Sequence, residues 1–392
     1  MRRALVLCAL ALVAGCGGDS EEPAEPPRAE TVERTKVEVI EPSGDDDARA
    51  FDPAQVYEQV GPGVVTILSI FREGNAEEDE DEDPNGGQGS GFVVAATGEI
   101  ATNAHVVTTG EGRDIEKADE VYVRFADHNQ VKARIVGFDP NSDVALLTLE
   151  TREGLTLRPL GLADSEDVDV GEPVVAIGSP FGEEQSLSVG VVSATDRAIQ
   201  SLTGFDTLGA VQTDAAINQG NSGGPLLDAR GEVIGINAQI RTRSGGGEGV
   251  GYAIPVDQVK RSLDRIRESG RVRYAYLGVA TTAVYPQVAE RFGLGTKTGA
   301  WVQEVVEDGP ADKAGIRAGE RVTRFQARPY RPGGDVITKV GPTPVRTEND
   351  LGLALTRYKP GDRVKLELFR EGERRTIEVE VAERPAQTEP PR

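Results

Sequence analysis

The sequence predicts a mainly β protein with more than one domain. Short β-branched runs recur along the chain and are separated by Gly, Asn, Asp and Pro, a pattern typical of strands joined by tight turns. Glycine is abundant, at 47 of 392 residues, and aromatic residues make up only 5% of the chain. From these observations we expect a large antiparallel barrel or a pair of barrels, followed by a second unit.

Residues 51–270 carry the first series of strands. The run 64–70 is almost continuously apolar, as in a buried strand. Two partly alternating runs, 121–125 and 131–136, are separated by turn residues. Apolar residues three or four apart over 256–266 predict an amphipathic helix that closes this unit. The other expected strands are 173–177, 185–194, 233–240 and 250–254.

A second unit is expected over 274–384, followed by a frayed Pro-rich tail at 385–392. A longer helix should begin at Thr347, because Thr347 and the acidic residues after it fit an N-terminal cap before Leu351, Leu355 and Tyr358. A short helix is expected near 311–316. The expected strands of this unit are 300–306, 364–369 and 376–381.

The N-terminus indicates export. Arg2 and Arg3 precede an apolar run of signal-peptide length, and the segment 1–16 ends at Cys16 in a pattern that resembles the bacterial lipoprotein signal. We expect lipidation of Cys16; ordinary cleavage that leaves a free thiol is the alternative. Residues 17–50 are acidic and Pro-rich and predict a disordered tether. A membrane-tethered lipoprotein, periplasmic or at the cell surface, is therefore expected.

Charge and cysteine content narrow the function. Both cysteines lie within the signal segment, so the mature chain should hold no internal disulfide and no zinc–thiolate site. The net charge of −22 argues against nucleic acid as a partner. The acidic run 77–83 leads into a calcium-loop-like segment, but Phe92 stands where the pattern requires Glu, so a solvated loop is the better interpretation. We expect no cofactor and no metal.

The hexapeptide 220–225 is the strongest chemical signal. It places Ser222 between glycines, which let the backbone bring several N–H groups to one point. An ordinary turn between strands has the same composition, so a nucleophile also needs a base and a group that orients it. Of the two histidines, His128 lies in a polar turn and is expected at the surface. The remaining candidate base, His105, would otherwise be a core residue, and Asp143 would otherwise cap its own turn.

The order His105, Asp143, Ser222 is that of the chymotrypsin-type triad, and each residue lies in a longer motif. Over residues 51–383 the chain resembles the HtrA/Deg family of serine proteases (DegP- and DegS-like). The motifs that carry the resemblance are Thr102-Asn103-Ala104-His105-Val106-Val107, Asp143-Val144-Ala145-Leu146-Leu147, Gln212-Thr213-Asp214-Ala215-Ala216-Ile217-Asn218, Gly220-Asn221-Ser222-Gly223-Gly224-Pro225-Leu226 and Gly251-Tyr252-Ala253-Ile254-Pro255.

The resemblance implies a chymotrypsin-like pair of six-stranded barrels over 51–270, with Ser222 as nucleophile, His105 as base and Asp143 as its orienting group. Gly220, Asn221 and Ser222 would form the oxyanion hole, and Ile217 would line a pocket for small aliphatic side chains. The family also implies a homotrimer, with Phe51 and Tyr57 as candidate contacts, and loops near 195–208 that respond to peptide binding.

The second unit resembles a PDZ domain, in which Tyr276, Leu277, Gly278 and Val279 would receive the carboxylate of a peptide C-terminus. An Arg-rich segment, 320–333, is inserted at a position where members of the family usually have no extra residues. It would reshape the peptide groove or contact the protease domain. The function predicted is an endopeptidase that cleaves misfolded or unfolded exported proteins. The alternative is a tethered chaperone or peptide sensor whose triad is idle.

Overall fold

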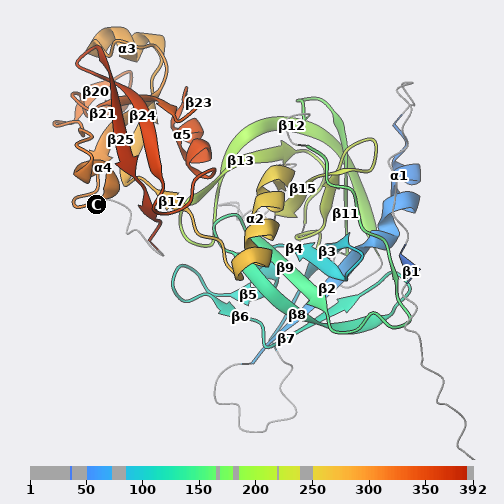
Figure 1. Ribbon diagram of the computed structural model, residues 1–392. Helices are drawn as coiled ribbons and strands as arrows, with labels where there is room; N and C mark the ends of the chain where they lie inside the picture. The colour runs from blue at the N-terminus through green and yellow to red at the C-terminus, as the bar shows by residue number, and fades with distance from the viewer. Residues whose placement is uncertain are drawn as a thin grey trace, which may run out of the picture.

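The computed structural model describes the backbone of 36–37 and residues 51–72, 85–164, 168–179, 185–218, 220–238 and 250–385. The signal segment with Cys16, the tether apart from 36–37, the acidic run 77–83 and the tail from 386 lie outside the described residues. The described residues form two barrels and a smaller β domain (Figure 1).

The first barrel closes six antiparallel strands in the order β2-β3-β4-β9-β8-β7. Its core contains Val65, Ile67, Ile100 and Leu147, all fully buried. The strands are β2 (Val64–Phe71), β3 (Asn85–Ala95), β4 (Glu99–Thr102), β7 (Glu120–Arg124), β8 (Gln130–Asp139) and β9 (Val144–Leu149). Short pairs accompany it: β1 (Lys36–Val37) with β10 (Thr156–Leu157), and β5 (Thr108–Thr109) with β6 (Glu116–Lys117).

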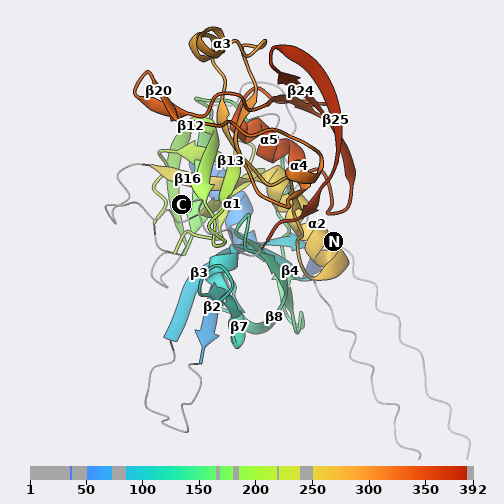
Figure 2. The ribbon, with the colours of Figure 1, turned by 90° about the vertical axis from the view of Figure 1, so that its left-hand side faces the viewer.

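The second barrel closes another six strands in the order β11-β12-β13-β16-β15-β14, and Figure 2 shows it above the first. The chymotrypsin-like pair of barrels is thus confirmed. The hairpin of β12 and β13 extends beyond the strand expected there, because register shifts let its long arms coil away from the barrel. The strands are β11 (Pro173–Gly178), β12 (Ser186–Gln200), β13 (Asp206–Thr213), β14 (Pro225–Leu227), β15 (Val233–Ala238) and β16 (Gly251–Pro255).

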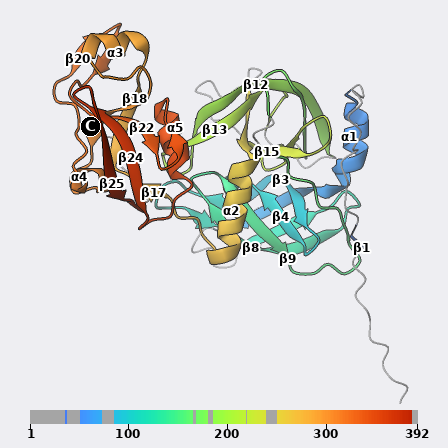
Figure 3. The same cartoon turned by 45° about the horizontal axis from the view of Figure 1, so that its top comes forward.

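One hydrophobic cluster joins the two barrels. Phe92 and Leu146 of the first barrel and Ile177 and Ile236 of the second belong to the same buried set. The amphipathic helix α2 (Val256–Ser269) adds its apolar face to this cluster and contacts strands of both barrels (Figure 3). Helix α1 (Pro53–Val60) and the single turns η1 (Gly61–Gly63) and η2 (Ala104–Val106) complete the unit. Burial of a common core holds the barrels in one orientation.

The C-terminal domain is a β sheet in the order β18-β19-β22-β24-β25, with β18 at its edge. Helix α5 (Glu348–Leu355) begins with the expected capping box of Thr347 and Asp350 but ends before Tyr358. The strands are β18 (Val279–Ala283), β19 (Ala300–Val305), β22 (Val336–Val340), β23 (Thr343–Pro344), β24 (Arg363–Arg370) and β25 (Glu373–Glu380), with β17 (Ala275–Tyr276) paired to β26 (Ala382–Glu383).

The other helices of this domain are α3 (Pro286–Phe292) and α4 (Pro310–Lys313). The helix expected near 311–316 is only one turn long, because Gly315 adopts a left-handed conformation that ends it. No helix among the described residues is both long and apolar enough to cross a membrane.

The inserted segment 320–333 forms a two-stranded hairpin, β20 (Thr323–Phe325) and β21 (Arg328–Tyr330). Phe325 packs edge-to-face on Phe292, and Tyr330 contacts Phe292 and stacks on Trp301, with ring centroids 5.2–5.9 Å apart across the cluster. The hairpin lies beside α3, on the side of the domain away from the barrels (Figures 1 and 3). It therefore extends the domain's own aromatic core.

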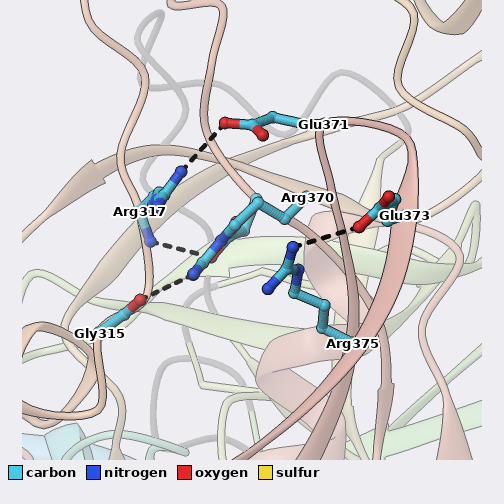
Figure 4. Close-up of polar contacts among 7 residues, drawn as sticks. Gly315, Arg317, Arg370, Glu371, Glu373 and Arg375 are labelled. Carbon is cyan, nitrogen blue, oxygen red and sulfur yellow. Dashed lines mark hydrogen bonds and ion pairs between the residues drawn. The ribbon is translucent and has the colours of Figure 1, made fainter.

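A buried ion pair between Arg370 and Asp335 ties a strand of this domain to its loops; Figure 4 shows Arg370 and its loop partner Gly315. The Arg370 guanidinium donates from Nε and Nη2 to the two oxygens of Asp335, at 2.8 and 2.7 Å, and Nη2 also donates to the carbonyl of Gly315. Asp335 is fully buried and accepts the backbone N–H of Arg317 as well. These hydrogen bonds raise the pKa of Arg370 above its usual value.

Replacing Asp335 with Ala should leave the Arg370 charge uncompensated and destabilise this domain by about 3–5 kcal/mol. The single tryptophan, Trp301, lies in this domain, so urea unfolding followed by tryptophan fluorescence reports on it directly. The matched control is Arg375→Ala, which removes an exposed pair with Glu373 drawn in the same view and should cost less than about 1 kcal/mol. Equal losses in the two variants would contradict this account.

Candidate active site

His105 and Asp143 are brought together by strand pairing in the first barrel. Thr102 at the end of β4 pairs with Ala145 near the start of β9, so the residues beyond these strand ends meet. His105 Nδ1 lies 2.7 Å from Asp143 Oδ2, and the His105 backbone N–H donates to Oδ1 at 2.9 Å. The carboxylate thus holds the proton of a neutral imidazole on Nδ1 and leaves Nε2 as the basic nitrogen.

The conformation around Asp143 is unusual. Asp143 has φ of +55°, a left-handed value that costs a non-glycine residue about 1 kcal/mol or more. Asn103 Nδ2 donates to its carbonyl at 2.8 Å and helps to hold the turn. His105 lies in η2, three residues beyond the end of β4, and its backbone N–H is used by the carboxylate.

Ser222 lies in the turn that leads into β14 of the second barrel. It is 3% exposed, and its Oγ makes no hydrogen bond to any described residue. Its carbonyl accepts the N–H of Ser90 at 2.8 Å, and the next residue, Gly223, donates to Asn237 at 2.9 Å. The turn is therefore held by its backbone while the hydroxyl stays unengaged.

Gly223 lies where the second barrel packs closely on the first. It has φ of +84°, and a β-carbon there would lie 2.1 Å from the Ser90 carbonyl oxygen and 2.3 Å from Thr102 Oγ1. Thr102 is three residues before His105, so the serine turn packs directly on the segment that carries the histidine. The structure brings all three predicted triad residues to one junction, with His105 and Asp143 from one barrel and Ser222 from the other.

Ser90 of β3 is a residue that sequence reasoning missed. It is fully buried, and its Oγ donates to the carbonyl of Gly220 at 2.5 Å while accepting the N–H of Ser179 at 2.9 Å. Its own carbonyl accepts Thr102 Oγ1 at 2.6 Å. The sequence signal was the Gly-Ser-Gly segment after the acidic run, whose serine reads as an ordinary strand residue.

Only part of the predicted oxyanion hole lies within the described residues. The Gly220 N–H shares its peptide with Gln219, which lies outside the described residues. The Asn221 N–H donates to the carbonyl of Asn218 at 3.0 Å and is therefore engaged within the loop. An oxyanion hole built from Gly220, Asn221 and Ser222 stays a prediction.

Ile217 is half-buried just before the serine turn. Its Cγ1 would lie 2.5 Å from a β-carbon at Gly251, so the side chain covers that glycine and packs against a cluster that includes Ala215 and Leu226. His128 lies in the exposed turn between β7 and β8 with φ of +65°, away from the triad, as the sequence indicates.

In the C-terminal domain, the predicted carboxylate-binding residues Tyr276–Val279 connect β17 to the edge strand β18. Gly278 has φ of +80°, and its carbonyl accepts the N–H of Val306 at 2.9 Å. The carbonyl of Leu277 accepts the N–H of Ala311 at the same distance. Helix α5 contacts β18, so an edge strand and a helix flank one another beside this turn, which is the geometry in which a peptide can add as a strand.

Comparison with known proteins places these features in a family. The trypsin-like peptidase domain matches residues 89–236, and the PDZ domain matches residues 275–381. A protein of Pseudomonas fulva named as a probable periplasmic serine endoprotease, DegP-like, is 42% identical over 298 residues, which is 76% of this chain and 56% of that protein. One of the same name from Hahella chejuensis is 37% identical over 362 residues, covering 91% of this chain and 70% of that protein.

The solved structure of the HtrA-type protease AlgW with a tripeptide has a TM-score of 0.68 at 32% identity, and the match covers 87% of this chain and 98% of that one. The chain spans little more than half the length of the Pseudomonas relatives. Both domains, in the same order and over nearly the whole of a solved relative, show that this chain belongs to the HtrA/Deg family of serine proteases with a C-terminal PDZ domain.

Proposed function

We propose that this protein is a serine endopeptidase that cleaves misfolded or unfolded proteins outside the cytoplasm. The observation that carries the proposal is the two-point contact of the Asp143 carboxylate with His105. Ser222, whose hydroxyl makes no hydrogen bond to a described residue, lies in the turn that packs on Thr102, three residues before His105. The names of the relatives, periplasmic serine endoproteases, support the same activity and place. With lipidation of Cys16, the enzyme would work from a membrane tether.

The proposed chemistry is that of a Ser-His-Asp triad. Ser222 Oγ attacks the peptide carbonyl while His105 Nε2 takes its proton, and the proton then passes to the leaving amine. Asp143 keeps the ring in the correct tautomer and stabilises the imidazolium. Water then attacks the acyl-enzyme with the same base, which regenerates Ser222. Backbone N–H groups of the 220–222 turn would stabilise the oxyanion.

We propose further that peptide binding at the PDZ domain regulates the protease domain. Helix α5, which flanks the edge strand, also contacts β13, and Figures 1 and 3 show the two side by side. Leu208 Cδ1 would lie 2.2 Å from a β-carbon at Gly352, so the helix packs closely on the hairpin arm. A peptide that shifts α5 would therefore act on the segment 195–208.

A homotrimer is proposed from the family alone. Its candidate contacts, Phe51 and Tyr57, pack against the chain's own core, and the Tyr57 hydroxyl donates to the carbonyl of Gln185 at 3.3 Å. The alternative function, a chaperone or peptide sensor with an idle triad, would leave the proteolytic test below negative.

Ser222→Ala should abolish hydrolysis of β-casein by the purified chain, with a loss of at least about 10³-fold because the nucleophile is gone. Casein fragments resolved on a gel over time provide the measurement. Equal activity in the two proteins, or activity in neither with C-terminal peptides added, would exclude the protease function and favour the chaperone.

Cleavage of a peptide library should occur mainly after Val and Ala, because the branched Ile217 side chain limits the depth of the pocket. Ile217→Ala should raise cleavage after Leu or Phe by about tenfold, since each methylene accommodated is worth about 1–3 kcal/mol. Mass spectrometry of the products gives both profiles. Cleavage by the parent protein chiefly after Arg, Lys or Phe would contradict this role for Ile217.

Ser90→Ala should reduce kcat by about tenfold, because the buried carbonyl of Gly220 and the N–H of Ser179 both lose their partner. The loss should appear equally in the rate at which a fluorophosphonate labels Ser222. Ser69 is a suitable control, since its Oγ is equally buried and donates to the carbonyl of Val106 at 2.7 Å without touching the serine turn. If Ser69→Ala and Ser90→Ala behave alike, Ser90 has no special role.

A further inference from the structure

Asp139 is a buried carboxylate that the triad does not contain. It is the last residue of β8, four residues before Asp143, and is 0% exposed. Its Oδ2 accepts three hydroxyls, from Ser142 at 2.5 Å, Ser262 at 2.7 Å and Tyr274 at 2.5 Å. Its Oδ1 accepts the N–H of Asn141 at 3.1 Å. A carboxylate out of water requires several donors of this kind, so every one of them is held tightly.

The three hydroxyls come from three different parts of the chain. Ser142 belongs to the turn that presents Asp143, Ser262 to α2, and Tyr274 to the connection between the protease and PDZ domains. Burial raises the pKa of the Tyr274 phenol well above its usual value, and the charge of Asp139 raises it further. Tyr274 therefore stays protonated and acts as a donor.

Arg384, at the C-terminal end of the PDZ domain, contacts the same turn. The Arg384 backbone N–H donates to the carbonyl of Tyr274 at 2.9 Å, and its Nη1 lies 3.4 Å from Asn141 Oδ1. The guanidinium also lies over Phe205 of the β12–β13 hairpin, 4.6 Å from the ring centroid. Thr203 and Thr207 of this hairpin donate to the side chain and backbone of Asn141, at 3.0 and 2.7 Å.

We infer that Asp139 is a positioning residue for the His105–Asp143 pair, and that the Tyr274 hydroxyl makes its action depend on the docked C-terminal domain. The inference rests on the proposed protease function. Asp143 occupies a strained left-handed conformation, so the residues before it must be held in place from outside the turn. The hydrogen-bond donors to Asp139 provide that hold, and one of them, the Tyr274 hydroxyl, belongs to the interdomain connection.

The test is Tyr274→Phe in the full chain, which removes one hydroxyl and keeps the ring. With a fluorescent casein as substrate, kcat should fall at least about tenfold, the effect of one lost hydrogen bond to a charged group, while KM stays within twofold. Labelling of Ser222 by a fluorophosphonate should slow by the same factor. Ser262→Ala removes a second donor, from α2, and should lower kcat in the same way. It replaces Tyr274→Phe as the test if that variant folds poorly.

Tyr122→Phe is the matched control, because its phenol also donates to a carboxylate, that of Glu120 at 2.6 Å, on strand β7 of the first barrel. It should leave kcat unchanged. Combining Tyr274→Phe with Asp139→Asn should cost less than the sum of the single effects, since both act through one contact.

The outcomes separate the two proposals. If the parent protein and Ser222→Ala hydrolyse casein equally, the protease function itself fails. If the parent is active and Tyr274→Phe and Ser262→Ala both retain its kcat, or the loss appears in KM instead, the positioning role of Asp139 is overturned.

Discussion

The site depends on the contact between the two barrels at Ser90. Each barrel carries one part of the proposed triad, so the triad can assemble only when the barrels are in register. Ser90 provides that register with its N–H and hydroxyl, which donate to the carbonyls of Ser222 and Gly220 in the second barrel. The glycine at 223 permits the approach, because any side chain there would overlap the Ser90 carbonyl. The shared hydrophobic core brings the barrels together, and these few buried hydrogen bonds determine how they are aligned.

Much of the fold was predictable, and the candidate triad could be proposed, because the relevant signals are local. Apolar runs of strand length predict the strands, and apolar residues with a 3.6-residue period on one face predict α2. The triad residues each lie in a motif whose residues are neighbours in sequence. The capping box of Thr347 and Asp350 is likewise complete within four residues.

The missed features are those whose partners are far away in the chain. Ser90 and Gly220 are 130 residues apart, and Asp139 and Tyr274 are 135 apart, so no periodicity or spacing links them. The inserted hairpin presents four arginines in its sequence, which suggested a contact surface. Its structure is instead determined by Phe325 and Tyr330, whose aromatic partners lie outside the insertion. The orientation of the Gly220 peptide is also a property of the folded loop, because glycine accepts either orientation at low cost.

The chemistry of Asp139 explains why domain docking and triad geometry are linked. Its described hydrogen-bond donors are three hydroxyls and one backbone N–H, and the nearby Arg384 is directed to Asn141 and to aromatic rings. A carboxylate buried without a paired cation is stable only while its neutral donors are all in place. Moving the Tyr274 hydroxyl away from Asp139 would leave the carboxylate with fewer hydrogen-bond donors, and water would enter to replace the lost one. The turn before Asp143 would then contact mobile water in place of the fixed Tyr274 hydroxyl. Because the same residue starts the path to the PDZ domain, any movement of that domain which displaces Tyr274 must also loosen the support of Asp143.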